Sequence, residues 1–186
     1  MIDKQEIGKQ RIFVVTGPAG VGKSTVSAIL AHYLNRSAYI PGDVIYDLVV
    51  GSKVDAGTSG DAAAPYYELL YRNLSSLLTN NLIFGNDVVV DYILDYPTTI
   101  EILQNVLASA KVRCECKYTL LLAEPDTIRK RDAQRPQADR CWPAGLTHTT
   151  ILKNACPPNH VIDTQSLSPN EVADKILEVK EMAITF

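Results

Sequence analysis

Short apolar runs alternate along the chain with longer segments in which apolar residues recur every three or four positions. The short runs predict buried strands over residues 11–16, 37–40, 87–91, 112–123 and 159–163. The longer segments predict helices over 23–35, 66–82, 97–110 and 168–182, with others beginning near Asp43 and Asp126 and one short turn over 149–154. Strands separated by helices predict an α/β fold, a parallel sheet covered by helices on both faces.

Two stretches lack any such period. Residues 51–65 are rich in Gly, Ala, Asp and Ser and predict a mobile loop. Residues 135–147 hold two prolines and one glycine and predict a loop or lid. Neither stretch resembles a linker, and no internal repeat is present, so we expect residues 1–186 to form a single domain.

The most specific motif is a phosphate-binding loop. Residues 17–24 read Gly-Pro-Ala-Gly-Val-Gly-Lys-Ser and match G-x-x-x-x-G-K-[ST], between a predicted strand and a predicted helix. Its amides and the helix N-terminus would point at a phosphate, with Lys23 on the β- and γ-phosphates and the Ser24 hydroxyl on Mg²⁺. The expected nucleotide-binding residues are Gly17, Pro18, Ala19, Gly20, Val21, Gly22, Lys23, Ser24 and Thr25.

Two aspartates follow predicted strands. Asp43 comes after a Pro-Gly exit from the second strand, and Asp91 ends the third strand as in a Walker B site. Because ligands on parallel sheets sit beyond the carboxyl ends of the strands, both carboxylates should face the phosphates. One acid would hold Mg²⁺ directly or through water, and the other would take a proton from a substrate hydroxyl. We assign the metal to Asp91 with Ser24, and the base to Asp43.

Simpler interpretations of these acids stay open. Asp43 is also suited to cap a helix, and Asp91 to bind backbone amides at the strand end. Asp47, one turn after Asp43, could share the site, whereas Asp95 is farther from the strand end and is expected to be solvated.

A basic cluster precedes and enters the predicted lid: Arg129, Lys130, Arg131, Arg135 and Arg140. Arg131 and Arg135 are four residues apart and share a face if the helix continues that far. An arginine arriving from a lid can stabilise the charge that spreads over a transferring phosphoryl group. A solvated basic helix face is the competing interpretation, chiefly for Arg129 and Lys130.

Composition and charge limit the binding partners and the cellular compartment that we expect for this protein. The formal net charge is −3, which gives no electrostatic reason to expect a nucleic-acid partner. No apolar run approaches the ~20 residues of a membrane helix, and the polar N-terminus lacks the apolar centre of a signal peptide. We therefore expect a cytoplasmic protein with no membrane partner, either a monomer or a homodimer.

Missing motifs exclude several classes of nucleotide-binding protein. A switch GTPase carries N-K-x-D and a D-x-x-G after the third strand, and neither is present. An AAA+ or helicase-type ATPase carries a glutamate after the Walker B acid, where this chain has Tyr92. What remains is a compact kinase.

The segments FVVTGPAGVGKST, AYIPGD, DVVVDYIL and LLLAEPDTIRKRDAQR resemble the small P-loop kinases of the gluconate kinase, shikimate kinase and chloramphenicol phosphotransferase group. They look closest to a bacterial AAA-type P-loop kinase branch of it. The resemblance covers nearly the whole chain. It implies a three-layer α/β/α fold with a five-stranded parallel sheet in the order 2-3-1-4-5 and a lid, and ATP with Mg²⁺ as donor.

The resemblance also implies roles for single residues. Asp43 would contact or deprotonate the acceptor hydroxyl, Arg131 or Arg135 would contact adenine or phosphate, and the stretch after Asp163 would border the adenine. We assign Arg131 to nucleotide binding and Arg135, with Lys23, to catalysis. The 51–65 loop is expected to shape the acceptor site, but it matches no acceptor-binding motif.

The expected activity is transfer of the γ-phosphoryl group of ATP to a hydroxyl of a small molecule such as a sugar acid or an antibiotic. A nucleoside or nucleotide kinase is a close alternative, for which Tyr66, Tyr67, Tyr71 and Arg72 are the relevant residues. An ATP-binding regulatory module with slow hydrolysis is an alternative of another class.

Overall fold

A computed structural model describes residues 10–51, 54, 60–112, 114–137, 140, 142–180 and 183–184. In chain order the strands are β1 (Gln10–Thr16), β2 (Ser37–Pro41), β3 (Asp87–Asp91), β4 (Cys114–Leu122), β5 (Val161–Asp163) and β6 (Ala183–Ile184). The helices are α1 (Lys23–Tyr33), α2 (Gly42–Tyr46), α3 (Ala64–Ile83), α4 (Tyr96–Ala110), α5 (Pro125–Ala133), α6 (Ala144–Ala155) and α7 (Pro169–Glu178), with a 3₁₀ turn at Pro158–His160.

The sheet has the strand order β2-β3-β1-β4-β5, and these five strands are parallel, which confirms the predicted topology. The register places Val15 of β1 opposite Asp91 of β3, and Asp91 opposite Pro41 of β2. The carboxyl ends of the three strands therefore meet at one edge. The phosphate-binding loop, Asp43 and Asp91 all begin there, as expected for a parallel sheet.

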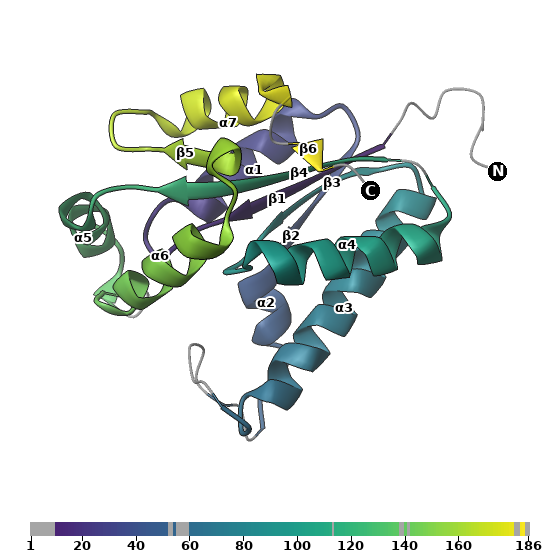
Figure 1. The fold of residues 1–186 in the computed structure, drawn as a ribbon, viewed down its shortest axis with the longest axis horizontal. Coiled ribbons are helices and arrows are strands. Elements are labelled where there is room, and N and C mark those ends of the chain that lie inside the picture. The colour runs from purple at the N-terminus through teal and green to yellow at the C-terminus, as the bar shows by residue number, and fades with distance from the viewer. Residues whose placement is uncertain are drawn as a thin grey trace.

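Helices cover both faces of the sheet (Figure 1). Successive strand residues point to opposite faces, so Ile12 and Val14 pack in one core cluster, and Phe13 and Val15 in the other. The first cluster receives the buried leucines of α3, and α4 and α6 also contribute to it: Leu70, Leu74, Leu78, Leu82, Ile102, Leu103, Val106 and Leu152. The second receives residues from α1 and α7: Val26, Leu30, Val172, Ala173 and Ile176. Burial on both faces explains why the strands read as continuous apolar runs.

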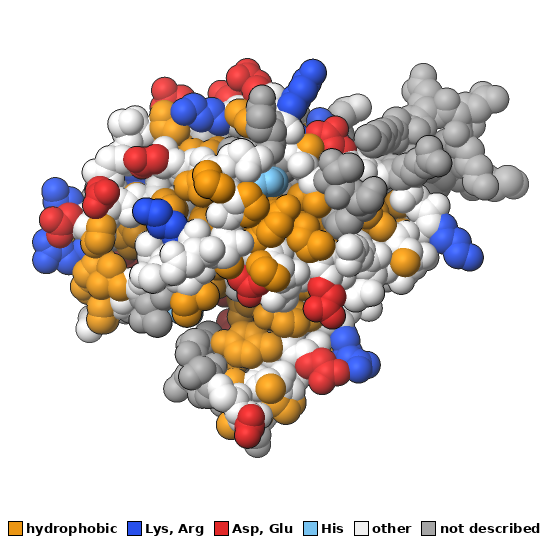
Figure 2. Space-filling model, in the orientation of Figure 1, with side chains coloured by type: hydrophobic (Ala, Val, Ile, Leu, Met, Phe, Trp, Pro, Cys, Tyr) orange, Lys and Arg blue, Asp and Glu red, His pale blue; other side chains and the backbone are white. Residues whose placement is uncertain are grey.

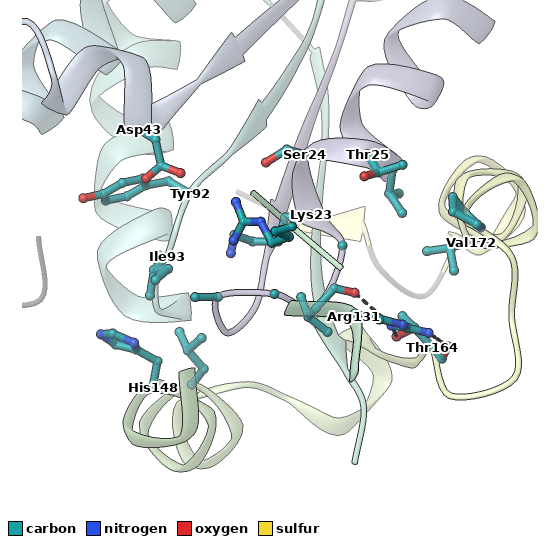
Figure 3. A pocket seen from close by; sticks show the side chains of 18 of the residues that line it. Lys23, Ser24, Thr25, Asp43, Tyr92, Ile93, Arg131, His148, Thr164 and Val172 are labelled. Atoms are coloured by element: carbon teal, nitrogen blue, oxygen red, sulfur yellow. Dashed lines mark hydrogen bonds between the residues drawn. The ribbon is translucent and has the colours of Figure 1, made fainter. Parts of the chain in front are cut away.

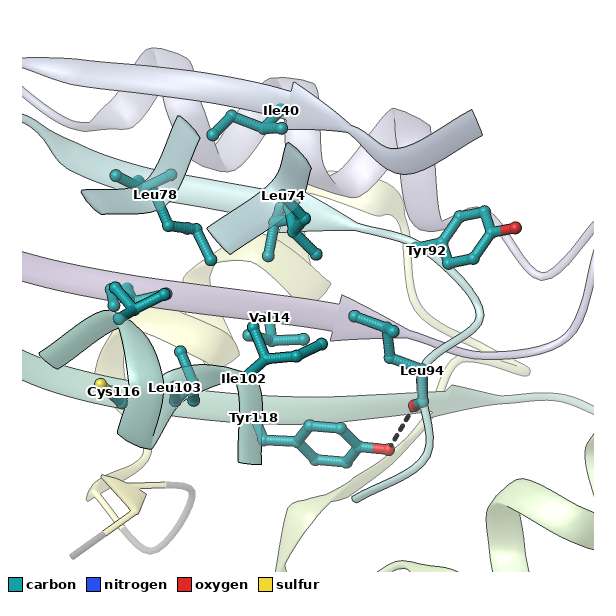
Figure 4. Packing of buried hydrophobic residues seen from close by; sticks show 14 of the residues in the cluster. Val14, Ile40, Leu74, Leu78, Tyr92, Leu94, Ile102, Leu103, Cys116 and Tyr118 are labelled. Atoms are coloured by element: carbon teal, nitrogen blue, oxygen red, sulfur yellow. Dashed lines mark hydrogen bonds between the residues drawn. The ribbon is translucent and has the colours of Figure 1, made fainter. Parts of the chain in front are cut away.

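A buried hydrogen-bond cluster fixes the segment that leaves β3. The Thr16 hydroxyl donates to the carbonyl oxygen of Leu94 at 2.9 Å and accepts from the amide of Leu94 at 3.0 Å. The Tyr118 hydroxyl donates to the same carbonyl at 2.9 Å, as Figure 4 shows. Both backbone groups of Leu94 are thereby satisfied in the core by side chains from β1 and β4.

The structure differs from the predicted elements in two notable places. The helix predicted as one turn over 149–154 is the twelve-residue α6, Ala144–Ala155, so it includes the last four residues of the expected 135–147 lid. The two-residue β6 pairs antiparallel with β4, beside Cys116 and Lys117, and was not predicted. Part of the 51–65 loop (52–53 and 55–59) and part of the lid (138, 139 and 141) lie outside the described residues.

Charged side chains of both signs are scattered over the face drawn in Figure 2, where the described residues form no single basic patch. That distribution agrees with the net charge of −3. Among the described residues, no helix is both long enough and apolar enough to span a membrane.

The Leu94 cluster yields a stability prediction. Thr16→Val keeps the shape of the side chain but leaves the buried amide of Leu94 without its partner. We expect a loss of about 1–3 kcal/mol in the free energy of unfolding, measured by chemical denaturation. Ser109→Ala is the control, because the exposed Ser109 hydroxyl donates only to Asn105 within its own helix. Equal stability of Thr16→Val and wild type would contradict this account of the cluster.

Candidate functional site

A cavity of about 740 Å³ opens at the carboxyl edge of the sheet. One end is formed by the phosphate-binding loop together with Arg131, Thr164, Leu167, Pro169 and Val172, and we call it the loop end. The other end contains Asp43, Tyr67, Tyr71, Tyr92, Asp95 and His148, and we call it the aromatic end. Figure 3 shows Asp43, Tyr92 and His148 on one side of Lys23, and Arg131, Thr164 and Val172 on the other.

The backbone of the phosphate-binding loop requires glycine at two positions. A Cβ on Gly17 would lie 2.5 Å from the carbonyl oxygen of Leu121, so the loop can cross the end of β4 only without a side chain. Gly22 is the N-cap of α1 with a φ of 111°, a left-handed conformation that favours glycine. No side chain caps α1, so its first-turn amides face the cavity as an anion-binding site. Lys23 lies in the same loop and donates to the carbonyl oxygen of Pro18 at 3.2 Å.

Asp91 is buried and lies directly beside the loop. Its carboxylate accepts hydrogen bonds from the hydroxyls of Ser24 at 2.7 Å and Tyr39 at 3.1 Å. Burial raises the pKa of Asp91 above its usual range, while the two hydrogen bonds and the charge of Lys23 oppose that shift. Burial, followed by the charge of Asp91, also raises the pKa of Tyr39, which keeps that phenol a donor. The partners of Asp91 are therefore side chains, not the backbone amides of the simpler interpretation.

The Ser24 and Asp91 pair fits a magnesium ion. A hydroxyl and a carboxylate 2.7 Å apart provide the hard oxygen ligands that Mg²⁺ prefers. Within the described part of the chain, no group of three or more His, Cys, Asp or Glu residues could hold a metal by itself. A magnesium ion held by Ser24 and Asp91 would take its remaining ligands from nucleotide phosphates and water.

Asp43 lies in the first turn of α2 and is exposed to the cavity. Pro41 is the N-cap of α2 and the structure has no side-chain cap there, so Asp43 is not the cap of the simpler interpretation. The residue before Asp43 must be glycine, because a Cβ at Gly42 would lie 2.6 Å from Cβ and Cδ2 of Tyr92. The ring of Tyr92 thus packs on the backbone beside Asp43. Asp47, the next acid along, does not line the cavity.

Arg131 joins two parts of the loop end. Its guanidinium donates to the carbonyl oxygen of Val21 at 3.1 Å, the Thr164 hydroxyl at 3.0 Å and the Thr164 carbonyl oxygen at 2.8 Å. It therefore positions the phosphate-binding loop against the segment after β5 while its side chain lines the cavity. Leu167 and Val172 lie farther along the chain and give the loop end an apolar wall. The family resemblance implied that adenine binds beside this stretch.

Arg135 lines the cavity just beyond α5, and its guanidinium lies 3.7 Å from the carboxylate of Asp132. Asp132 is buried and also accepts from the amide of Trp142 at 3.1 Å. A Cβ on Gly20 would lie 3.6 Å from Cβ of Asp132, so this acid also contacts the phosphate-binding loop. Asp132 thus links that loop, Arg135 and the start of the segment leading into α6.

The other members of the basic cluster do not line the cavity. Arg129 is exposed and pairs with Asp126 at 3.1 Å, and Lys130 is exposed on the same helix. Arg140 donates to the carbonyl oxygens of Ala133 and Arg135 at 3.0 and 3.2 Å, and so it caps the end of α5. The competing interpretation as a solvated basic face therefore describes Arg129 and Lys130.

Sequence reasoning missed three acidic or phenolic residues of the site: Tyr39, Asp95 and Asp132. Asp95 is half-buried and lines the cavity, so the expectation that it is solvated was wrong. Its carboxylate accepts from the amide and hydroxyl of Thr98 at 2.8 and 2.9 Å and so caps α4. The sequence Asp-Tyr-Pro-Thr was a usable signal for that cap, since proline favours the first helical turn. Tyr39 and Asp132 carry no such local signal.

The comparisons with known proteins agree with the fold described above. A family model described as an AAA domain matches residues 13–141, from β1 through the phosphate-binding loop to the start of the predicted lid. The chain belongs to this family. A search of curated protein sequences found no match.

Several solved structures with a similar fold are described as kinases. An unliganded sugar kinase from Janibacter sp. HTCC2649 has a TM-score of 0.66 at 14% identity, over 94% of this chain and 96% of that one. An APS kinase from Mycobacterium tuberculosis, in complex with AMPPNP and APS, has a TM-score of 0.60 at 20% identity, over 93% and 98%. A tunicamycin resistance protein from Deinococcus radiodurans has a TM-score of 0.58 at 17% identity, over 96% and 100%. These identities show a shared fold, as the resemblance predicted.

The Gly42 contact yields a prediction. We expect Gly42→Ala to force Tyr92 away from α2 and to lower the free energy of unfolding by about 1–3 kcal/mol, measured by chemical denaturation. Gly51→Ala is the matched control, because nothing lies within 4 Å of a Cβ at that position. If both variants are equally stable, the backbone of Gly42 does not set the position of Tyr92.

Asp91 yields a second prediction, for the protein without nucleotide. Its raised pKa means that the native state binds a proton more tightly than the unfolded state. The contribution of Asp91 to stability therefore falls as pH rises from the usual aspartate value near 4 through the raised pKa. Asp91→Asn should be at least as stable as wild type at pH 7 and should flatten this pH dependence. It should also weaken Mg²⁺-dependent nucleotide binding roughly 10–100-fold.

Denaturation at several pH values and titration of nucleotide with and without Mg²⁺ measure both effects. A variant less stable than wild type at pH 7 would contradict the burial argument, and an unchanged Mg²⁺ dependence would contradict the metal assignment.

Proposed function

We propose that this protein is an ATP-dependent phosphotransferase that moves the γ-phosphoryl group to a hydroxyl of a small molecule. The observation that carries the proposal is the single cavity that joins the phosphate-binding loop to Asp43. Among the described residues, the Asp43 carboxylate has no hydrogen bond or ion pair, so it is available to a ligand. A site built only for hydrolysis would not need a second, aromatic end of this size.

The donor ATP would bind with its phosphates on the loop and its base against the apolar wall near Leu167 and Val172. Lys23 would neutralise charge on the β- and γ-phosphates, and Ser24 and Asp91 would hold Mg²⁺. Bound there, Mg²⁺ would supply Lewis-acid stabilisation of the phosphate oxygens. Arg131 would hold the loop end in shape through Val21 and Thr164.

Asp43 would act as the general base. The acceptor hydroxyl oxygen forms a bond to the γ-phosphorus while the bond from that phosphorus to the bridging oxygen of ADP breaks. The hydroxyl proton passes to Asp43, and ADP leaves with the electrons of the broken bond. Arg135 would stabilise the charge on the transferring group, held near it by Asp132.

A nucleoside acceptor has some support as a second candidate. Tyr67 and Tyr71 line the aromatic end, where a base could stack. Arg72, the residue expected to bind an acceptor phosphate, does not line the cavity and instead pairs with Glu68 on the exposed face of α3 at 2.7 Å. Because Arg72 lies outside the cavity, a nucleoside fits better than a nucleotide.

The test is ATP consumption with Mg²⁺ across sugars, sugar acids, nucleosides, nucleotides and antibiotics, with products identified by mass. We expect one class to raise turnover and to gain one phosphoryl group. Asp43→Asn should lower kcat for that class by roughly 10²–10⁴ while ATP affinity stays within about threefold. Lys23→Ala should weaken ATP binding or turnover.

Asp47→Asn is the matched control, since Asp47 lies one turn after Asp43 and outside the cavity lining. Unchanged turnover in Asp43→Asn would overturn the base assignment. Slow hydrolysis that no acceptor increases, with ATP still bound, would overturn the phosphotransferase proposal and favour a regulatory ATP-binding module.

A further inference from the structure

The residues at the aromatic end of the cavity indicate which class of acceptor could bind there. This inference rests on the proposed function, in which phosphoryl transfer takes place in this cavity. The residues of the aromatic end come from three separate segments: Asp43 from α2, Tyr67 and Tyr71 from α3, and Tyr92 and Asp95 from the segment after β3. They line the same cavity, and Asp95 lies close enough to Tyr71 to raise the pKa of its phenol.

One wall of this end consists of tyrosine rings. Tyr67 and Tyr71 are one helical turn apart on α3 and stack with centroids 6.4 Å apart. Tyr46 extends the row, with its centroid 5.9 Å from that of Tyr67. Such rings offer flat apolar surface to a ligand ring and hydroxyls at their tips.

Two phenols at this end, those of Tyr71 and Tyr92, can donate hydrogen bonds to a ligand. Burial, followed by the charge of Asp95, raises the pKa of Tyr71 to about 12. Neither hydroxyl forms a hydrogen bond within the described part of the chain, and both residues line the cavity. They can therefore bind hydroxyl groups of a ligand.

The charge at this end is negative. Asp43 and Asp95 both line it, and apart from the imidazole of His148 no basic side chain of the described residues does. The basic residues that line the rest of the cavity have partners outside the aromatic end. Lys23 donates to Pro18, Arg131 donates to Val21 and Thr164, and Arg135 lies beside Asp132.

We propose that the acceptor is a hydroxylated ring compound without a carboxylate, phosphate or sulfate group, and that an ammonium group on the ring strengthens its binding. The tyrosine wall packs against the ring, the phenols of Tyr71 and Tyr92 bind its hydroxyls, and Asp95 attracts the cation. An anionic group would face two carboxylates in a partly buried site, where opposite charges attract and like charges repel more strongly than in water. Unmodified sugars, amino sugars and nucleosides fit this class, whereas sugar acids and nucleotides do not.

The experiment measures binding separately from transfer. Protein loaded with AMPPNP and Mg²⁺ is titrated calorimetrically with matched pairs: glucose and glucuronate, glucosamine and glucose, cytidine and cytidine 5′-monophosphate. The member without the anionic group should bind roughly tenfold or more tightly than its anionic partner in at least one pair, and glucosamine more tightly than glucose. Parallel reactions with ATP record which members gain a phosphoryl group.

Asp95→Asn tests the source of the selectivity, because asparagine can still cap α4 while the charge is lost. This variant should reduce two preferences roughly three- to tenfold: the preference for the member without an anionic group, and the preference for glucosamine over glucose. Asp163→Asn is the matched control: the Asp163 carboxylate also accepts from a backbone amide, that of Gln165 at 2.8 Å, but Asp163 does not line the cavity. We expect wild-type selectivity in this control.

The two proposals fail in different ways. Tighter binding and phosphorylation of the anionic members would overturn this inference and leave the phosphotransferase proposal standing. Selective binding of the other members without any phosphoryl transfer would uphold the inference and overturn the proposed function. If no member without an anionic group binds, or if Asp95→Asn leaves the selectivity unchanged, the inference is wrong.

Discussion

The hydrogen bond from the Ser24 hydroxyl to the Asp91 carboxylate ties the phosphate-binding loop to the neighbouring strand end, and the rest of the site depends on it. Asp91 is buried, so its charge is tolerable only with donors and a cation close by. Ser24 and Lys23 of α1 and Tyr39 of β2 provide them. The same oxygen atoms are suited to a magnesium ion, which would relieve the burial of the charge further. The free-energy cost of burying the Asp91 carboxylate therefore favours the binding of a metal ion beside it.

Side chains that hold backbone segments in place define the two ends of the cavity. At the loop end, Arg131 binds the backbone of Val21 and Thr164, segments far apart in the sequence. At the aromatic end, Thr16 and Tyr118 hold the backbone of Leu94, midway between the cavity residues Tyr92 and Asp95. In both places buried backbone groups find partners in side chains from other elements, because no regular secondary structure is present to satisfy them. The cavity can therefore keep a fixed shape although loops form much of its lining.

The sequence was a good guide to the parts of the molecule governed by local pattern. The apolar runs of β1 and β3 and the buried leucines of α3 predicted the sheet and a covering helix, and a motif of eight residues predicted the loop. It was a poor guide to single polar residues. Arg140 belonged to the expected basic cluster but caps α5, and Asp95 was expected in solvent but lines the cavity. The role of a polar side chain depends on the groups that the fold places beside it, and these groups cannot be predicted from spacing along the chain.

By itself the sequence determined the order of strands and helices, the phosphate-binding loop and the edge of the sheet where Asp43 and Asp91 emerge. These follow from the period of apolar residues and from parallel-strand geometry, both of which act over short stretches of chain. Only the tertiary structure decided that Gly42 accommodates Tyr92, that Asp132 joins Arg135 to the loop, and that tyrosines and Asp95 share one end of the cavity. Those are contacts between residues tens of positions apart, and their distances are set by how the helices pack on the sheet.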